Sequence, residues 1–285
     1  MSIQTRAAGS IWGVRWQVLQ RIARQEVRDA LLGWSFYLTA AVALLLAALL
    51  VYNSVRFVDE SGLNIVSRPF FQPLFVATSL ALLYVIVGAA LAIVRPREQG
   101  ALQILFFAPV DAAALVGAHF LAGVAIYALL LALLVPPLLL LVWITNFVVP
   151  ASLLWGLLPT LPVAGLGVAF GLFVSAIARS SRMVVLLLVA VLLLLWAIQG
   201  GYAALLNIPP TSRYYDALRF LRVVSRNLNA YLVWVSPFHA LDASLEAALR
   251  GGWGAVASYG LAALAESLLW LAAAIAGVRE RGVLP

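Results

Sequence analysis

The chain has 285 residues, of which 65% are hydrophobic and 10% are charged, and its mean hydropathy is +1.05. A soluble domain carries roughly 25% charged residues, so this composition excludes an ordinary soluble fold and indicates an integral membrane protein. No cysteine is present and all 18 basic residues are arginine, which excludes disulfides, thiolate metal sites, a lysine-dependent phosphate loop and Schiff-base chemistry.

Residues 11–31 predict an amphipathic helix ahead of the first apolar span. Apolar residues recur there every three or four positions, with glutamines and arginines on the other side: Trp12, Trp16, Leu19, Ala23, Val27 and Ala30 against Gln17, Gln20, Arg21, Arg24 and Arg28. Such a helix suits the headgroup region of a membrane. Two interpretations stay open: a simple anchor, or an elbow helix that steers the first span and touches a partner.

Six stretches of 18 or more residues with few charges predict transmembrane helices in one domain covering residues 1–285. They are residues 33–52, 71–94, 112–144, 151–177, 183–200 and 254–277. The fold class is therefore an all-α integral membrane protein. An even number of spans places both termini on one side, and eleven of the 18 arginines lie there against seven opposite. The positive-inside rule then predicts a multi-pass cell-membrane protein with both termini in the cytoplasm.

Residues 95–111 form a sharply bounded polar connection between the second and third spans. Gly100 allows a tight turn beside Glu98. The residues from 101 to 107 fit a short amphipathic helix that presents Leu102, Leu105 and Phe106 to a hydrophobic groove. We interpret this segment as a docking element for a cytoplasmic partner. The alternative for Glu98 is a loop carboxylate neutralised by a neighbouring arginine.

Prolines and glycines interrupt the third and fourth apolar stretches. Pro136-Pro137 and Pro159 predict kinks, because a proline inside a helix removes a hydrogen bond. Gly167 and Gly171 form a small-xxx-small pair, which permits close helix approach. On the opposite side of the membrane, residues 201–253 predict two short helices, which are either a solvated, interfacially anchored segment or a lid over the exit of a transport path.

Glu266 lies within the sixth span, 13 residues before Arg279 and therefore about 20 Å along the helix from the cytoplasmic boundary. A carboxylate at that depth costs about 2.5–3.5 kcal/mol unless it is paired, protonated or facing water. We expect Glu266 to face a substrate path or a dimer seam, or to be a protonated carboxyl bonded to Ser267 or to backbone. Gln199, near the outer end of span five, is a candidate partner or an interfacial residue.

The run from Arg97 to Leu102, with Leu105, Pro109 and Val110, resembles the E-x-G-T-L…L…P-V signature of the ABC transporter type-2 permease family. Further segments are similar to the same family: Gly171-Leu172-Phe173-Val174-Ser175, Ser236-Pro237-Phe238 and Arg279-Glu280-Arg281. Ala101 departs from the threonine usual in that family, so a hydroxyl contact is missing there.

The resemblance implies a permease subunit that works with a second permease copy or paralogue and with two separate P-loop ATPase subunits, more often in export than in import. ATP and Mg would then bind in the partner ATPase, and this chain would bind no cofactor, hold no metal and catalyse no reaction of its own. The implied ATPase-coupling residues are Arg97, Glu98, Gly100, Ala101, Leu102, Leu105 and Phe106.

The basic composition, with a pI near 10.2, indicates contact with anionic membrane lipids rather than nucleic acid. An ion-gradient-driven secondary transporter or channel is the alternative function, and it predicts several buried ionisable residues at midplane. Glu266 is the residue of this kind that the predicted spans contain. The scarcity of charge in the spans favours an apolar or amphipathic cargo, and both homodimers and heterodimers of permeases remain open.

Overall fold

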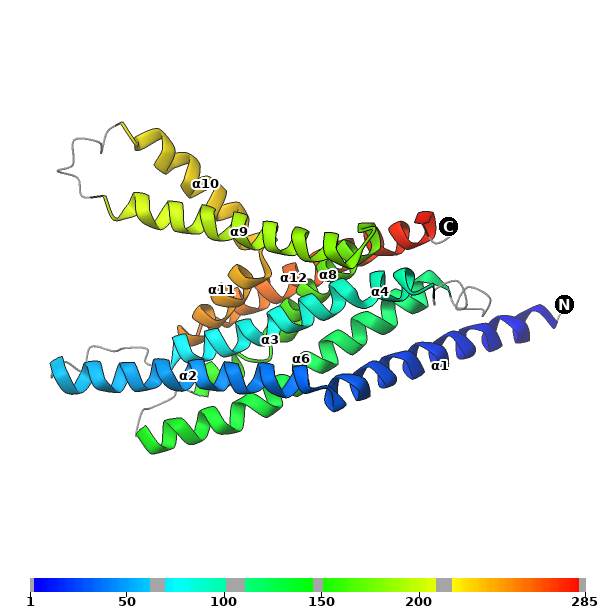
Figure 1. Cartoon of the computed structure of the whole chain (residues 1–285), viewed down its shortest axis with the longest axis horizontal. Coiled ribbons are helices and arrows are strands. Elements are labelled where there is room, and N and C mark those ends of the chain that lie inside the picture. Colours follow the sequence, from blue (N-terminus) through cyan, green and yellow to red (C-terminus); the bar gives the residue numbers. More distant parts are fainter. Residues whose placement is uncertain (1–2, 62–69, 101–110, 146–150, 209–216, 282–285) are drawn as a thin grey trace.

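The computed structural model describes residues 3–61, 70–100, 111–145, 151–208 and 217–281, and every regular element in these ranges is an α-helix (Figure 1). Six of the described helices are long and apolar enough to cross a membrane. They belong to α2 (Trp34–Ser61), α3 (Phe71–Ala92) continued by α4 (Val94–Glu98), α6 (Ala112–Thr145), α8 (Thr160–Ile177), α9 (Ser181–Leu206) and α12 (Trp253–Arg281). The predicted all-α, six-span class is confirmed.

The first and last described residues of the chain lie at the same end of the bundle. Figure 1 shows the start of α1 (Ile3–Leu32) and the end of α12 at the same end as α4. We call this the terminal end, and the other the far end. An even number of crossings requires this arrangement.

Helix α8 lies at the centre of the bundle and is buried along most of its length, packed mainly against α12 and α3. Two glycines allow α3 to come this close. A Cβ at Gly171 would lie 2.7 Å from the backbone oxygen of Ile86, and one at Gly167 would lie 2.9 Å from side-chain atoms of Ile86 and Leu82. The small-xxx-small pair therefore brings two helix backbones together.

The prolines act differently in the two stretches that contain them. Helix α6 runs without interruption through Pro136 and Pro137 and, with 34 residues, is about 50 Å long. In contrast, residues 151–177 form two helices rather than one span: α7 (Ala151–Trp155) and α8, separated by a turn that ends at Pro159. The residue before a proline avoids helical geometry, and proline is favoured at helix starts.

Two spans expose long apolar faces in the single chain. Most of α9 is exposed, including Leu186, Leu194 and Trp196, and its main neighbour is α10 (Arg219–Val235). Figure 1 shows α9 and α10 diverging from the rest of the bundle toward the far end. Helix α2 also presents a row of exposed leucines beside α3.

Helix α1 packs along the first part of α6. A break at Gly33 separates it from α2, and in Figure 1 the two helices follow one another without a right-angled bend. Glu26 of α1 contacts Nδ1 of His119 on α6, which ties the two helices together. An orientation of α1 in the headgroup plane stays a prediction.

Candidate functional site at the terminal end

Arg97 binds the end of α8. Its Nη1 donates hydrogen bonds to the carbonyl oxygens of Ala178 at 3.2 Å and Ala176 at 3.5 Å. The last carbonyls of a helix lack intrahelical donors and carry the negative end of the helix dipole. A guanidinium, which offers several donors and a permanent charge, suits that position.

Glu98 binds the start of α9. Its carboxylate accepts a hydrogen bond from the backbone N–H of Ser181 at 2.9 Å and another from the Ser181 hydroxyl. A negative group is favoured at a helix N-terminus for the reason that a positive one is favoured at a C-terminus. Two consecutive residues of the predicted coupling segment thus hold the two sides of the α8–α9 turn. We call these contacts the Arg97–Glu98 clamp.

Ser175 supplies a second link in the same place, deeper in the protein. Its hydroxyl oxygen accepts hydrogen bonds from the backbone N–H groups of Ile93 and Val94, both at 3.1 Å. These two amides lie where α3 ends and α4 begins, and all three residues are buried. The α3–α4 joint is therefore fastened to α8 from inside, while the clamp fastens it at the surface.

Gly100 follows the clamp in a left-handed conformation, with φ of +71°. That backbone geometry favours glycine, because an L side chain there is strained. Its backbone N–H donates to the Arg97 carbonyl at 3.1 Å, in the turn that ends α4. The remaining predicted coupling residues, Ala101, Leu102, Leu105 and Phe106, lie outside the described part of the chain.

The structure therefore brings Arg97 and Glu98 together with residues that the sequence argument assigned no role. Ser175 belongs to a motif used for the family resemblance, but nothing local predicts that its hydroxyl reaches α3. Ser181 was missed. The available signal was Ser180-Ser181 directly before an apolar run, which is typical of a helix start.

The same end of the bundle carries a contact between the third and sixth spans. Asp111, just before α6, lies 4.0 Å from Arg279 near the end of α12. The backbone oxygen of Asp111 accepts the first bond of α6 from Leu115 N–H. Segment 101–110, which lies outside the described residues, is thus preceded by the clamp residue Glu98 and followed by Asp111, and both of these contact other spans.

Glu266 is half-buried on α12. It lies one helical turn before Trp270, whose ring packs edge-on against Phe170 and at a tilt against Phe173 of α8. The neighbouring Ser267 hydroxyl donates to the Leu264 carbonyl at 2.8 Å. Glu266 therefore flanks the packed seam of α12 rather than lying in it.

Gln199 has a different neighbour from the one the sequence suggested. Its Nε2 lies 3.5 Å from Nδ1 of His239 on α11 (Pro237–Leu249). Asp242 lies one turn further along α11. Burial raises the pKa of the Asp242 carboxyl, and nearby His239 lowers that pKa by a smaller amount. These groups form a polar cluster at the far end. Within the described residues, no group of three potential ligands fits a metal ion.

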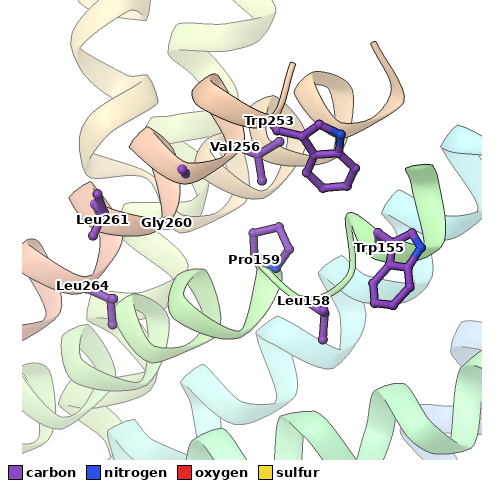
Figure 2. Close-up of a pocket in the computed structure, with 9 residues that line it drawn as sticks. Trp155, Leu158, Pro159, Trp253, Val256, Gly260, Leu261 and Leu264 are labelled. Atoms are coloured by element: carbon purple, nitrogen blue, oxygen red, sulfur yellow. The ribbon is translucent and has the colours of Figure 1, made fainter. Parts of the chain in front are cut away.

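An apolar groove of about 730 Å³ opens between the α7–α8 turn and the start of α12 (Figure 2). The indole of Trp155 lines it from the α7 side and that of Trp253 from the α12 side, and Pro159 lies next to them at the end of the turn. The α12 wall continues through Gly260 and Leu264. Tryptophan is enriched at membrane interfaces, so we expect this groove to lie near the headgroup level at the far end of the bundle.

These features define a polytopic, all-helical membrane protein whose spans are fastened together beside a turn at the terminal end. The family model described as ABC-2 type transporter matches residues 15–226, well over half of the chain. The chain belongs to the ABC-2 type transporter family and is a multi-pass permease of an ABC transporter. A comparison with curated proteins gives no match.

Proposed function

We propose that this chain is the permease subunit of an ATP-driven exporter and that a separate pair of P-loop ATPase subunits moves it through residues 95–111. ATP and Mg bind in those subunits. The 285 residues contain no lysine, so a lysine-dependent phosphate loop lies outside them. The observation that carries the proposal is the Arg97–Glu98 clamp, which joins the coupling segment to two spans beyond those it connects.

The clamp gives the proposed docking segment a mechanical role. A push on residues 101–110 acts on α3 through α4 and on α6 through Asp111. The bonds to Ala178 and Ser181 carry the same displacement to α8 and α9. Movements of packed helices between two discrete arrangements are the usual basis of switching in such proteins. A segment attached to four spans is better suited to this than one attached to two.

The orientation follows from charge. Eleven of the 18 arginines, including Arg97 of the clamp and Arg279, belong to the side that the terminal end represents. We therefore place the terminal end in the cytoplasm, where the ATPase subunits dock. The exposed apolar faces of α9 and α2 support a second permease, or lipid, as their neighbour. Glu266, on the flank of α12, is proposed to face the transport path or this seam.

Two glycines provide a matched test of coupling. Gly100 and Gly251 have φ of +71° and +72°, and a Cβ at either would meet no atom within 4 Å. Replacement by alanine therefore imposes the same backbone strain without a steric clash, on opposite ends of the bundle. Gly100→Ala is expected to lower the ATPase activity that depends on the permease, and Gly251→Ala is expected to leave it unchanged.

The experiment uses the permease co-purified with its proposed ATPase partner and reconstituted in vesicles. Glu98→Ala is the second variant, since it removes the bond to α9. Equal ATP hydrolysis and transport by wild type, Gly100→Ala and Glu98→Ala would contradict coupling through this segment. Glu266→Leu is measured in the same assay, and full transport with normal assembly would exclude a role for Glu266 in either process.

A further inference from the structure

A cavity of about 420 Å³ lies at the terminal end among α1, α3, α4 and α6. Its lining divides into a polar and an apolar part. The polar part comprises Glu26, Asp29, Arg95, Gln99 and His119, and the apolar part includes Val85, Gly88, Ala89, Gly123 and Ile126. The cavity is separate from the groove of Figure 2 and shares no residue with it.

The two parts lie at different depths. Tyr84 precedes Arg95 by eleven residues, which corresponds to about 16 Å of helix at 1.5 Å per residue. A molecule with a polar head and an apolar body of that length would match the lining from end to end. The volume falls within the range of roughly 300–1,000 Å³ that is usual for small-molecule sites.

The charge in the polar part favours a cation. Asp29 has no ion-pair partner among the described residues, and Glu26 contacts the imidazole of His119. The single guanidinium, Arg95, also interacts with Glu98 of the clamp, so its charge is shared. The polar part of the lining therefore holds two carboxylates against one guanidinium.

The two carboxylates also stand between two hollow spaces. A second cavity of about 300 Å³, lined by Ile22, Gln25 and Leu115, shares Glu26, Asp29 and His119 with the first. The His119 side chain is only 10% exposed and lines both cavities. Both carboxylates therefore border open space on two sides, and a ligand in either cavity would lie next to them.

We propose that this cavity binds an amphiphilic organic cation, with its positive head at Asp29 and Glu26 and its apolar body along α3 and α6. The ring of Tyr84, which lines the deep end beside Phe36, is placed for an edge or stacking contact with an aromatic body. The site goes beyond the proposed function, because binding to the chain requires neither ATP nor a partner subunit.

Gly88 offers a direct way to close the cavity. It lines the cavity, and a Cβ added there would meet no atom within 4 Å. Gly88→Leu therefore places its Cβ in open space and directs a larger side chain toward the cavity. Gly200 on α9 has the same open surroundings away from the cavity, so Gly200→Leu is the matched control. Asp29→Asn removes the charge while keeping the size of the side chain.

The binding experiment uses the purified full-length chain in lipid nanodiscs, with fluorescence anisotropy of the cationic dye rhodamine 6G. Wild type and Gly200→Leu are expected to bind the dye saturably. Asp29→Asn is expected to bind about fivefold more weakly, as for loss of one partly exposed ion pair of about 1 kcal/mol. Gly88→Leu is expected to lose saturable binding, with an unfolding midpoint equal to that of wild type.

Three results would overturn the site. They are saturable binding unchanged in Gly88→Leu, binding unchanged in Asp29→Asn, and equally tight binding of an anionic dye of similar size such as fluorescein octyl ester. Because none of these measurements uses transport or ATP hydrolysis, failure of the site leaves the proposed export function standing, and the reverse also holds.

Discussion

Ser175 allows the internal fastening of the coupling segment to be tested quantitatively. Its hydroxyl is fully buried and accepts bonds from two buried backbone N–H groups, those of Ile93 and Val94. Ser175→Ala removes the acceptor and leaves both amides without it. An unsatisfied buried donor costs about 1–3 kcal/mol, so we expect the two together to lower the free energy of unfolding by about 3 kcal/mol.

Ser267 provides the control. It is also a buried serine within a span, but its hydroxyl donates to the Leu264 carbonyl three residues earlier in the same helix. Ser267→Ala leaves no backbone donor unpaired, and we expect a loss below about 1 kcal/mol. Both variants remove the same atom from a buried position, so the difference between them reports the orphaned amides.

Thermal unfolding in detergent, followed by tryptophan fluorescence, measures both. At about 2–4 °C per kcal/mol for a chain of this size, Ser175→Ala is expected to unfold roughly 6–12 °C below wild type and Ser267→Ala within about 4 °C of it. Equal midpoints for the two alanine variants would refute the argument that Ser175 fastens the α3–α4 joint. Wild-type coupling of ATP hydrolysis in a destabilised Ser175→Ala would separate stability from coupling.

Two further predictions concern helix packing and the far end. Gly171→Ala is expected to prevent normal α3–α8 packing and reduce the yield of folded protein in detergent, because the new Cβ would meet the backbone oxygen of Ile86 at 2.7 Å, whereas Gly88→Ala, with open surroundings, should behave as wild type. Asp242→Asn is expected to raise the unfolding midpoint at pH 7. Burial raises the pKa of Asp242 in the folded protein, so wild type loses stability as pH rises above the unfolded value of about 3.9, and the advantage of the variant should vanish below that pH.

The sequence predicted the architecture because long apolar stretches and the few charges between them are read directly from composition. Six spans, the position of the polar connection and the importance of Gly167 and Gly171 for close approach all follow from patterns along the chain. The split of residues 151–177 into α7 and α8 was not predicted. Proline has the same local effect in α6 and before α8, and only the surrounding helices decide whether a span continues or turns.

The sequence singled out some, but not all, of the residues that form the polar contacts at the terminal end. The pattern identified Arg97, Glu98 and Gly100, but it assigned Glu98 to a partner protein or a neighbouring arginine. The structure shows both oxygens of that carboxylate used by Ser181, 83 residues later in the chain. Pairings at such separation depend on how helices pack, and hydropathy along one chain contains no information on them. The same reason explains why Gln199 meets His239 rather than Glu266.

The clamp leads to a final prediction, that α9 is the span that moves most. Helix α9 has few neighbours in the bundle besides α10, yet Glu98 holds its first residue. Because few packed neighbours hold α9 in place, a displacement of α4 meets the least resistance there. A rigid helix of 26 residues would transmit that displacement to the far end. The chain has no cysteine, so Leu194→Cys on α9 and Leu268→Cys on α12, both at exposed positions, provide two unique sites for spin labels.

In permease assemblies diluted with unlabelled chain, the distance between these labels is expected to change when ATP binds the partner subunits. Glu98→Ala should abolish that change while ATP binding persists, since the residue links α4 to α9 but has no part in nucleotide binding. A distance that responds to ATP equally in both proteins would show that force reaches α9 by another route. An unchanged distance in wild type would mean that α9 is fixed and that the clamp serves only to stabilise the turn.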